Sequence, residues 1–393
     1  MSGVEQFVKD HRNLVTATVC LIAAAVLPLF FDPLSSITDN FITAGAYVVM
    51  ALGLNIVVGF AGLLDLGYVA FYAFGAYTVG WFASDHFSSV NGEKGIHVLA
   101  GEFASSLPGI HLNFLLVMLL AVVIVGIAGM LIGLPTLRLR GDYIAIVTLA
   151  FGEIIYRFAV NGDEISVVDG YKLTNGRQAI APVDAIDLPG FAGFDSAFNL
   201  RPYFWFVLVL VALVLLVNFR LRDSRLGRAW IAMREDEVAA ASMGVPLVKT
   251  KLLAYATGAA FGGMSGAFLG SYQASVQADQ FKFGFSIFVL AMIILGGLGS
   301  IWGVVLGAVL LSFINTYFIP EVFNSVPRTL GLDFDLTVLN FGIFGFLILL
   351  VMVLRPQGLL PERRRAMELT EGIGAGDAIG SESETNVDVG RQP

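Results

Sequence analysis

The chain has 393 residues, of which 56% are hydrophobic and only 14% are charged, and its mean hydropathy is +0.79. A soluble protein of this length needs far more charged surface, so the composition indicates an integral membrane protein. The net charge of -8 is not typical of a nucleic-acid partner, and the single cysteine, Cys20, excludes a disulfide framework and a thiolate metal site.

Ten apolar stretches are candidates for crossing a lipid bilayer, which takes about 20 residues of helix. Because the stretches are too long for transmembrane strands, they predict an all-α integral membrane protein, a bundle of about ten helices. The count depends on two short joins, between the second and third stretches and between the eighth and ninth. The predicted spans are 14–31, 42–59, 64–84, 112–134, 143–160, 203–219, 251–272, 284–299, 301–318 and 335–354.

The basic residues of the loops predict the orientation, because Lys and Arg in short loops stay on the cytoplasmic side. With the N-terminus inside and the spans alternating, the inside segments 1–13, 135–141, 220–251 and 355–365 hold fifteen basic residues, against six in the outside loops. Both termini are therefore predicted to be cytoplasmic.

The predicted organisation has three parts: a cytoplasmic segment, 1–13, a transmembrane domain, 14–360, which includes the cytoplasmic loop 220–251, and a cytoplasmic tail, 361–393. The tail has three consecutive arginines near its start and is otherwise rich in glycine, serine and acidic residues. Such a composition cannot bury enough apolar surface to fold, so the tail is predicted to be disordered.

Charged residues inside spans are costly and mark candidate functional positions. Glu153 and Arg157 are four residues apart in the fifth span, in the favourable order for a helical ion pair. The pair is about equally compatible with a polar point on a translocation pathway and with a structural pair near the outer end of the helix.

Asp65 follows a turn marked by Gly59 and Gly62 and precedes the third span. The favoured interpretation is a cap that accepts free backbone N–H groups of the first helical turn. The alternative is a broken helix whose exposed N-terminus faces an anionic substrate group, and Asn55, one turn earlier, fits either interpretation.

Glycines recur at every fourth position in two stretches and place a small-residue face on each predicted helix. Tight packing inside the bundle or against a partner subunit is the more probable role, and a sliding surface used in gating is the alternative. The two sets are Gly258, Gly262, Gly266 and Gly270, and Gly299, Gly303 and Gly307.

The outer loop, 161–202, contains Thr174 and Asn175 followed by glycine, which is a turn sequence. These two residues are candidate substrate contacts, although a merely solvated loop is equally consistent with the pattern.

Residues 220–251 form a polar island between two spans, with seven basic residues against four acids. Its middle is helix-prone, and Gly244 followed by Pro246 predicts a helix stop. The loop charges place the island in the cytoplasm, where we expect it to dock a partner.

The chain carries no motif of an enzyme. Its four histidines lie in loops or at span ends without an HExxH pair, and the sequence has no Walker A motif for ATP. We therefore expect no catalytic residues, no cofactor and no metal.

At the island, the sequence GRAWIAMREDEVAAASMGVPLVKTKLLAY resembles the cytoplasmic EAA-type coupling loop of ABC importer permeases. More closely, the chain is similar to the M-type permease subunits of branched-chain amino acid importers. Further matching blocks follow the same order: LNIVVGFAGLLDLGYVAFYAFGAYT (54–78), LPTLRLRGDYIAIVTLAFGEIIYRF (134–158), FVLAMIILGGLGSIWGVVLGA (288–308) and RPQGLLP (355–361).

The resemblance implies an ATP-driven importer of branched-chain or related hydrophobic amino acids in the cell membrane of a prokaryote. The implied partners are a second homologous permease subunit, two cytoplasmic ATP-binding subunits and an external substrate-binding protein. The implied coupling motif falls on Glu237, Ala239, Ala240 and Gly244, with flanking ATPase contacts at Arg228, Arg234, Glu235 and Asp236.

The chain departs from the family in the outer loop, where the usual Gly-rich TGGxxGI reads TNGRQAI, with Asn175 and Ala179 at two of the usual glycine positions. This departure leaves the exact substrate open. The nearest alternative is the same machine carrying urea or short amides. An ion-coupled secondary transporter using Asp65 and Glu153 is a second alternative, and it leaves the island 220–251 without a role. A structural scaffold is a third alternative, and it does not explain the ordered blocks.

Overall fold

The computed structural model describes most of the chain from residue 12 to residue 323, and the isolated positions 342, 345–346, 349–350, 353–355 and 357–361. The gaps within 12–323 are 89–93, 101–105, 138, 140, 169–170, 189–193 and 195–198. The tail, the N-terminal segment and most of the predicted tenth span lie outside the described residues.

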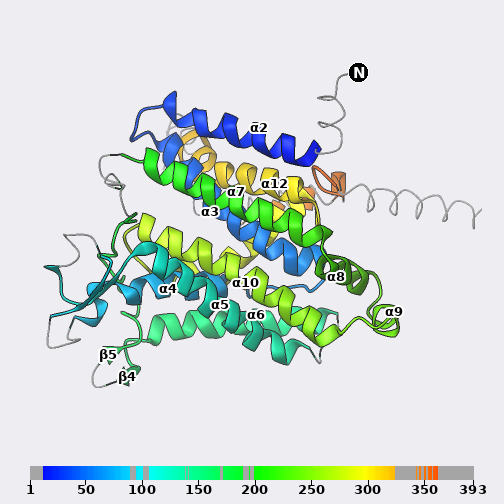
Figure 1. Cartoon of the computed structure of the whole chain (residues 1–393), viewed down its shortest axis with the longest axis horizontal. Helices are drawn as coiled ribbons and strands as arrows, with labels where there is room; N and C mark the ends of the chain where they lie inside the picture. The colour runs from blue at the N-terminus through cyan, green and yellow to red at the C-terminus, as the bar shows by residue number, and fades with distance from the viewer. Residues whose placement is uncertain are drawn as a thin grey trace, which may run out of the picture.

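Helices make up most of the described chain (Figure 1). They are α2 (Arg12–Val26), α3 (Ser36–Leu54), α4 (Val69–Phe82), α5 (Phe114–Thr136), α6 (Asp142–Asn161), α7 (Arg201–Asp223), α8 (Arg225–Glu235), α9 (Glu237–Ser242), α10 (Leu247–Tyr272), α11 (Phe283–Gly296) and α12 (Ile301–Phe313). Two π-helices, η2 (Asn55–Phe60) and η6 (Ile314–Phe323), continue α3 and α12.

Six of the described helical segments are long and apolar enough to cross a membrane. Three shorter apolar helices, Cys20–Leu29, Val69–Phe82 and Phe283–Gly296, coincide with the first, third and eighth predicted spans. A helix is therefore found at each of the first nine predicted spans. The total of ten and the orientation stay predictions.

The third predicted span begins later than expected, because residues 61–68 are not helical and α4 starts only at Val69. This non-helical segment is mostly buried, although it joins two helices of the bundle. The chain therefore has a helix break here, longer than the short join that the sequence predicts.

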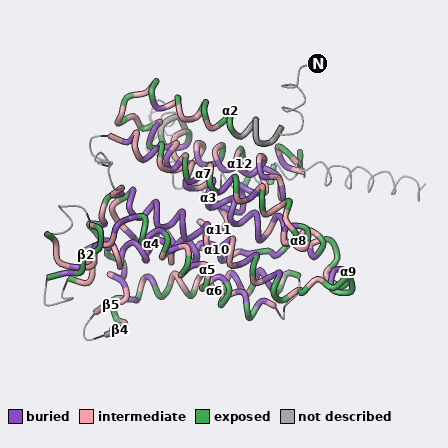
Figure 2. The backbone as a smooth tube through the Cα atoms, in the orientation of Figure 1, coloured by how far each residue is buried: buried purple, intermediate pink, exposed green. Residues whose placement is uncertain are grey.

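The centre of the bundle is α10, which packs against α3, α4 and α5 (Figure 1). Burial follows this arrangement, since α3 and α10 are mostly buried whereas α5 and α6 expose much of their surface (Figure 2). Apolar side chains cover these exposed faces, which suits contact with lipid or with another subunit.

The recurring glycines of α10 pack inside the chain. A Cβ at Gly258 would meet the Gly53 carbonyl oxygen of α3, and one at Gly266 would overlap the backbone of α4 at Tyr72. The Gly303 and Gly307 positions of α12 face the α11 backbone in the same way. The predicted role in tight packing within the bundle is therefore correct for these positions.

Short strands occur outside the helices, so the all-α prediction holds for the spans and not for the loops. Strands β1 (Ala83–Ser84), β3 (Ile110–Leu112) and β2 (Ile96–Val98) form a sheet in that order, antiparallel and then parallel. Strands β4 (Ser166–Val168) and β5 (Tyr171–Lys172) form a hairpin. Loop backbone beyond the helices has no helical partners, and pairing between loops satisfies its N–H and C=O groups.

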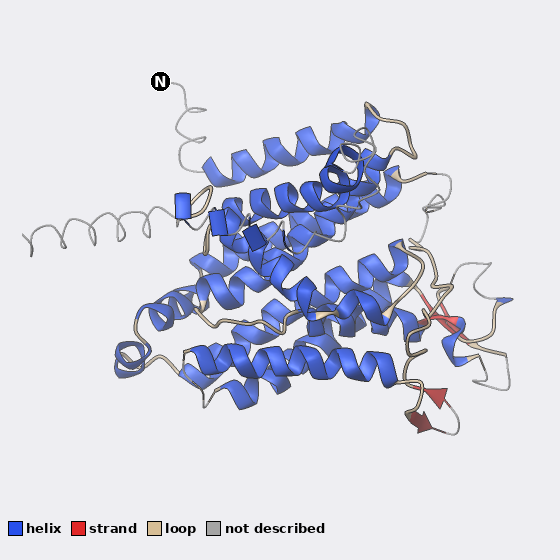
Figure 3. Cartoon of the chain, turned by 180° about the vertical axis from the view of Figure 1, so that it is seen from behind, coloured by secondary structure: helices blue, strands red, loops and turns tan. Residues whose placement is uncertain are grey.

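The strands lie at one end of the bundle and the helices α8 and α9 at the opposite end (Figures 1 and 3). We call these the strand end and the loop end. Segments distant in sequence meet at both, which positions the candidate sites described next.

Candidate functional site

The polar island folds into two short helices that project from the loop end (Figure 1). Ser224 caps α8, since its hydroxyl accepts a hydrogen bond from the Gly227 N–H at 3.1 Å. Asp236 caps α9, accepting from the N–H groups of Val238 and Ala239 at 2.8 and 2.9 Å. The predicted stop is correct, because α9 ends at Ser242 and Gly244 has a φ of +87°.

Two buried contacts hold this loop against α10. The Trp230 side chain is fully buried, and its Nε1 donates to the Thr250 carbonyl oxygen at 2.8 Å. The Lys251 ammonium, only 4% exposed, lies 2.7 Å from Oε1 of Glu237. Because α9 has six residues and cannot be stable alone, these contacts fix its position.

The outer face of α9 is exposed and partly apolar. Val238 is 65% exposed and Met243 is 86% exposed, and Ala239 between them is exposed as well. Ala240 faces the opposite way and is buried. A short helix with small residues and two projecting apolar side chains suits insertion into a groove of another protein.

The predicted ATPase contacts divide into two groups. Arg228, Glu235 and Asp236 are exposed on the loop, and Arg228 donates to the Asp223 carbonyl oxygen at 2.8 Å. Arg234 instead turns toward the chain itself, where its Nη1 donates to the Gly59 carbonyl oxygen. Of the four predicted contacts, Arg228, Glu235 and Asp236 are therefore exposed and Arg234 is directed inward.

The predicted pathway residues Asn55, Gly62 and Asp65 gather around the helix break. Asn55 is fully buried, and its Oδ1 accepts from the Gly299 N–H at 3.0 Å. Gly62 has a φ of +70° and packs against the Arg234 side chain. The break thus contacts both the α8 helix and the α11–α12 join.

Asp65 does not cap α4 as predicted. It is buried, and its Oδ1 accepts from the Gly67 N–H at 2.9 Å, two residues before the helix starts. The first helical N–H, at Val69, donates to Oγ of Ser286 instead. Asp65 stands four residues ahead of the helix, so its short side chain reaches only a local turn.

Glu153 and Arg157 form the predicted ion pair on α6, with Nε and Oε1 2.8 Å apart. Both side chains are substantially exposed, on a face of α6 that the described chain does not cover.

The candidate residues of loop 161–202 make contacts within the chain. Thr174 is buried and donates to the Ala159 carbonyl oxygen at 2.8 Å. The Asn175 side chain donates to the Ala179 carbonyl oxygen at 3.2 Å and closes the local turn. These two residues stabilise the loop.

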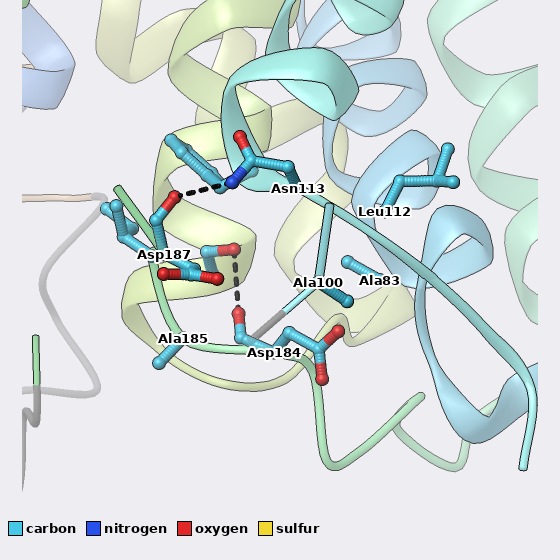
Figure 4. Close-up of a pocket in the computed structure, with 10 residues that line it drawn as sticks. Ala83, Ala100, Leu112, Asn113, Asp184, Ala185 and Asp187 are labelled. Carbon is cyan, nitrogen blue, oxygen red and sulfur yellow. Dashed lines mark hydrogen bonds between the residues drawn. The ribbon is translucent and has the colours of Figure 1, made fainter. Parts of the chain in front are cut away.

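A cavity of about 170 Å³ opens at the strand end (Figure 4). Asn113 donates to the Asp187 carbonyl oxygen at 3.1 Å, and Ser271 donates to the Asp184 carbonyl oxygen at 2.9 Å, which fixes the cavity wall. The sequence does not single out Asp184 and Asp187, because the cavity joins residues that are far apart in the chain. The lining residues are Ala83, Ala100, Leu112, Asn113, Phe114, Asp184, Ala185, Ile186, Asp187 and Ser271.

A buried histidine stands beside this cavity. His111 Nδ1 lies 2.7 Å from Oδ2 of Asp184, and Nε2 lies 3.2 Å from Oδ1 of Asp85 and 3.1 Å from the Pro108 carbonyl oxygen. The His97 ring stacks on it, with centroids 5.5 Å apart. Burial lowers the pKa of His111, but the hydrogen bond to Asp184 and the charges of Asp184 and Asp85 outweigh it and raise the pKa.

We expect the strand end to lose stability as pH rises from about 6 to about 8, the range where a histidine titrates. Burial also raises the pKa of Asp184, which Asp187 supports, so both groups bind protons more tightly in the folded state. Such a group stabilises the folded state fully at a pH below its pKa in the unfolded state. This stabilisation is lost as the pH rises past its higher pKa in the folded state. Hydrogen exchange of residues 83–88 and 106–112 measures this. The dependence should shrink in His111→Gln and in Asp184→Asn, and its persistence in both would contradict the assignment.

The six long apolar helices define a polytopic membrane protein, and a helical loop projects from one end of it. Residues 36–354 match the family described as "Branched-chain amino acid transport system / permease component", and the chain belongs to this family.

Several curated proteins are similar to the chain. The high-affinity branched-chain amino acid transport system permease protein LivM of Salmonella typhimurium is 38% identical over 84% of this chain and 71% of its own length. A probable branched-chain amino acid transport permease protein LivM of Methanocaldococcus jannaschii is 27% identical over 81% of this chain and 91% of its own length. The high-affinity branched-chain amino acid transport system permease protein LivH of Escherichia coli is 26% identical over 49% of this chain and 64% of its own length. No solved structure matches the chain.

Proposed function

We propose that this chain is the membrane-spanning permease subunit of an ATP-driven importer for branched-chain or related hydrophobic amino acids. The loop formed by α8 and α9 carries the proposal, because it presents an exposed helix that is firmly anchored to the bundle. The family membership and the two LivM relatives support the substrate class.

The partner of the exposed α9 face is a cytoplasmic ATP-binding subunit, one of two in the assembly. Val238 and Met243 supply apolar contact area, and the exposed charges of Arg228, Glu235 and Asp236 orient the docking. The Glu237–Lys251 pair then passes the movement of the ATPase to α10, which runs through the centre of the bundle.

A second homologous permease subunit covers the exposed face of α6. The ion pair of Glu153 and Arg157 on that face is costly in lipid, so protein or a water-filled pathway must lie against it. The similarity to both LivM and LivH relatives supports a pair of related permeases.

The orientation follows from the same assembly. The loop end is cytoplasmic, both termini lie inside, and an external binding protein delivers substrate at the strand end in the cell membrane of a prokaryote. The basic residues of the loops support this topology, with fifteen in the predicted inside segments against six in the outside loops.

The competing functions have weaker support. A urea or short-amide importer would use the same architecture, but the matching family and relatives are named for branched-chain amino acids. An ion-coupled transporter that uses Asp65 and Glu153 leaves the α9 face without a partner, and Glu153 is already paired with Arg157.

Uptake of radiolabelled leucine into proteoliposomes tests the function. The complex of both permeases, the ATP-binding subunits and the binding protein is expected to accumulate leucine only with ATP, and excess isoleucine or valine should compete while urea should not. Transport of urea alone would overturn the amino-acid assignment. Transport by this chain alone, driven by an ion gradient, would overturn the ABC assignment.

A further inference from the structure

Two interruptions of the helical bundle lie close together at the loop end. One is the break between α3 and α4, residues 61–68, preceded by the π-helix η2. The other is the join between α11 and α12, residues 297–300. Segments where the backbone leaves the helix absorb changes of backbone angle more easily than helix interiors do, so such joins serve as hinges.

Arg234 of α8 contacts the first interruption at two points. Its guanidinium donates to the Gly59 carbonyl oxygen at the end of η2, and a cation is favoured at such a helix C-terminus. Its aliphatic stem packs on Gly62, where an added Cβ would lie 3.1 Å from the Arg234 Cβ and overlap Cγ. The positive φ of Gly62 brings the backbone this close.

Asn55 joins the first interruption to the second. Its Oδ1 accepts from the Gly299 N–H at 3.0 Å. Gly59 lies between the two, since an added Cβ there would overlap the Asn55 amide and come within 2.8 Å of the Gly299 nitrogen. Arg234, Gly59, Asn55 and Gly299 therefore form one contiguous chain of contacts.

A third segment closes the α11–α12 join from the other side. The N–H groups of Leu359 and Leu360 donate to the carbonyl oxygens of Leu295 and Gly296 at 2.9 and 3.0 Å. The block that follows the last predicted span thus holds the end of α11. The join is fixed on two sides, and the Asn55 contact connects it to η2, which continues α3.

We propose that Arg234 is a positioning residue that transmits the movement of α8 to both helix interruptions, and that it is not a contact of the ATPase. This proposal rests on the proposed function. The buried Trp230 makes α8 move as one body with the start of α10, so a tilt of α8 displaces the Arg234 guanidinium and the carbonyl it holds. Gly59 passes the displacement to Asn55 and Gly299.

The test uses the whole importer in proteoliposomes and measures ATP hydrolysis and leucine uptake together. In Arg234→Gln, co-purification of the ATP-binding subunits and ATP hydrolysis should stay within about twofold of wild type, while leucine uptake falls about tenfold. A tenfold loss is the size expected when a hydrogen bond to a charged group is removed. ATP consumed per leucine therefore rises. Arg234→Lys should recover a good part of the coupling, because an ammonium can still donate to one carbonyl.

The matched control is Arg225→Gln, which removes an exposed cation from the same helix. It should leave the ratio of ATP hydrolysed to leucine taken up unchanged. Asn55→Ala should raise the ratio as Arg234→Gln does, and the double variant should be no worse than the more severe single, since both act on one link. The proposal is overturned if hydrolysis and uptake fall in parallel, if co-purification is lost, or if the two losses multiply. If the glutamine variant does not fold, Arg234→Lys and Asn55→Ala decide the matter, because full uncoupling in the first or a wild-type ratio of ATP hydrolysed to leucine taken up in the second would overturn the proposal. A wild-type complex without ATP-dependent uptake would instead refute the proposed function.

Discussion

Replacing Glu237 with lysine is expected to abolish co-purification of the ATP-binding subunit and to reduce uptake at least about tenfold, while the chain still inserts into the membrane. The substitution leaves the nearly buried Lys251 ammonium without its partner and adds a second cation beside it. Breaking a buried pair costs about 3–5 kcal/mol, and the partial exposure of Glu237 places the effect near the lower limit. That loss exceeds the roughly 1.4 kcal/mol that corresponds to a tenfold change.

The change acts on the docking surface through the position of α9. Lys249→Gln is the matched control, because Lys249 is exposed two residues from Lys251, and uptake should stay within about twofold of wild type. Exchanging the two charges, with Glu237→Lys and Lys251→Glu together, should restore part of the docking. Normal co-purification and normal uptake in Glu237→Lys alone would rule out a coupling role for this residue.

A second large effect is expected from Gly266→Ala in the centre of the bundle. The new methyl group would overlap the Tyr72 carbonyl oxygen and lie 2.9 Å from the Ala76 nitrogen, and backbone atoms cannot turn aside as a side chain can. Helices α4 and α10 must move apart, at a cost of about 1–3 kcal/mol. The purified protein should aggregate at a lower temperature in detergent, as fluorescence-detected size-exclusion chromatography after heating will measure.

The control for this substitution lies one turn further along the same helix. A Cβ at Gly270 would find its nearest neighbour, Val276 Cγ2, at 3.4 Å, which is ordinary van der Waals contact. Gly270→Ala should therefore leave the aggregation temperature within a few degrees of wild type. Equal behaviour of the two variants would show that the glycines of α10 do not set the helix separation.

The sequence is sufficient for the features that depend on neighbouring residues. The length of the apolar stretches locates the first nine predicted spans. The spacing of four residues between the α10 glycines predicts a packing face. The ion pair of Glu153 with Arg157 and the end of α9 before Gly244 follow from local spacing and turn chemistry too. Each of these features is decided within one continuous stretch of the chain.

Other features depend on segments that are far apart in the chain. The cap expected of Asp65 is made by Ser286, because folding brings α11 to the start of α4. His111 meets Asp85 and Asp184 only when loops pair at the strand end. Which group satisfies a buried N–H or carbonyl depends on the backbone that packs beside it, and spacing along the chain does not contain that information.

Arg234 shows the same division most clearly. A charged residue in a polar loop is expected to face solvent or a partner, and in sequence it cannot be distinguished from Arg228 on the same helix. In the fold, Arg228 is exposed while Arg234 binds the Gly59 carbonyl oxygen, because η2, which continues α3, lies against the last turn of α8. Apolar length and loop charge were enough to predict a membrane protein with a polar loop between two spans, but only the packing of α8 on η2 decided which charges of that loop face inward.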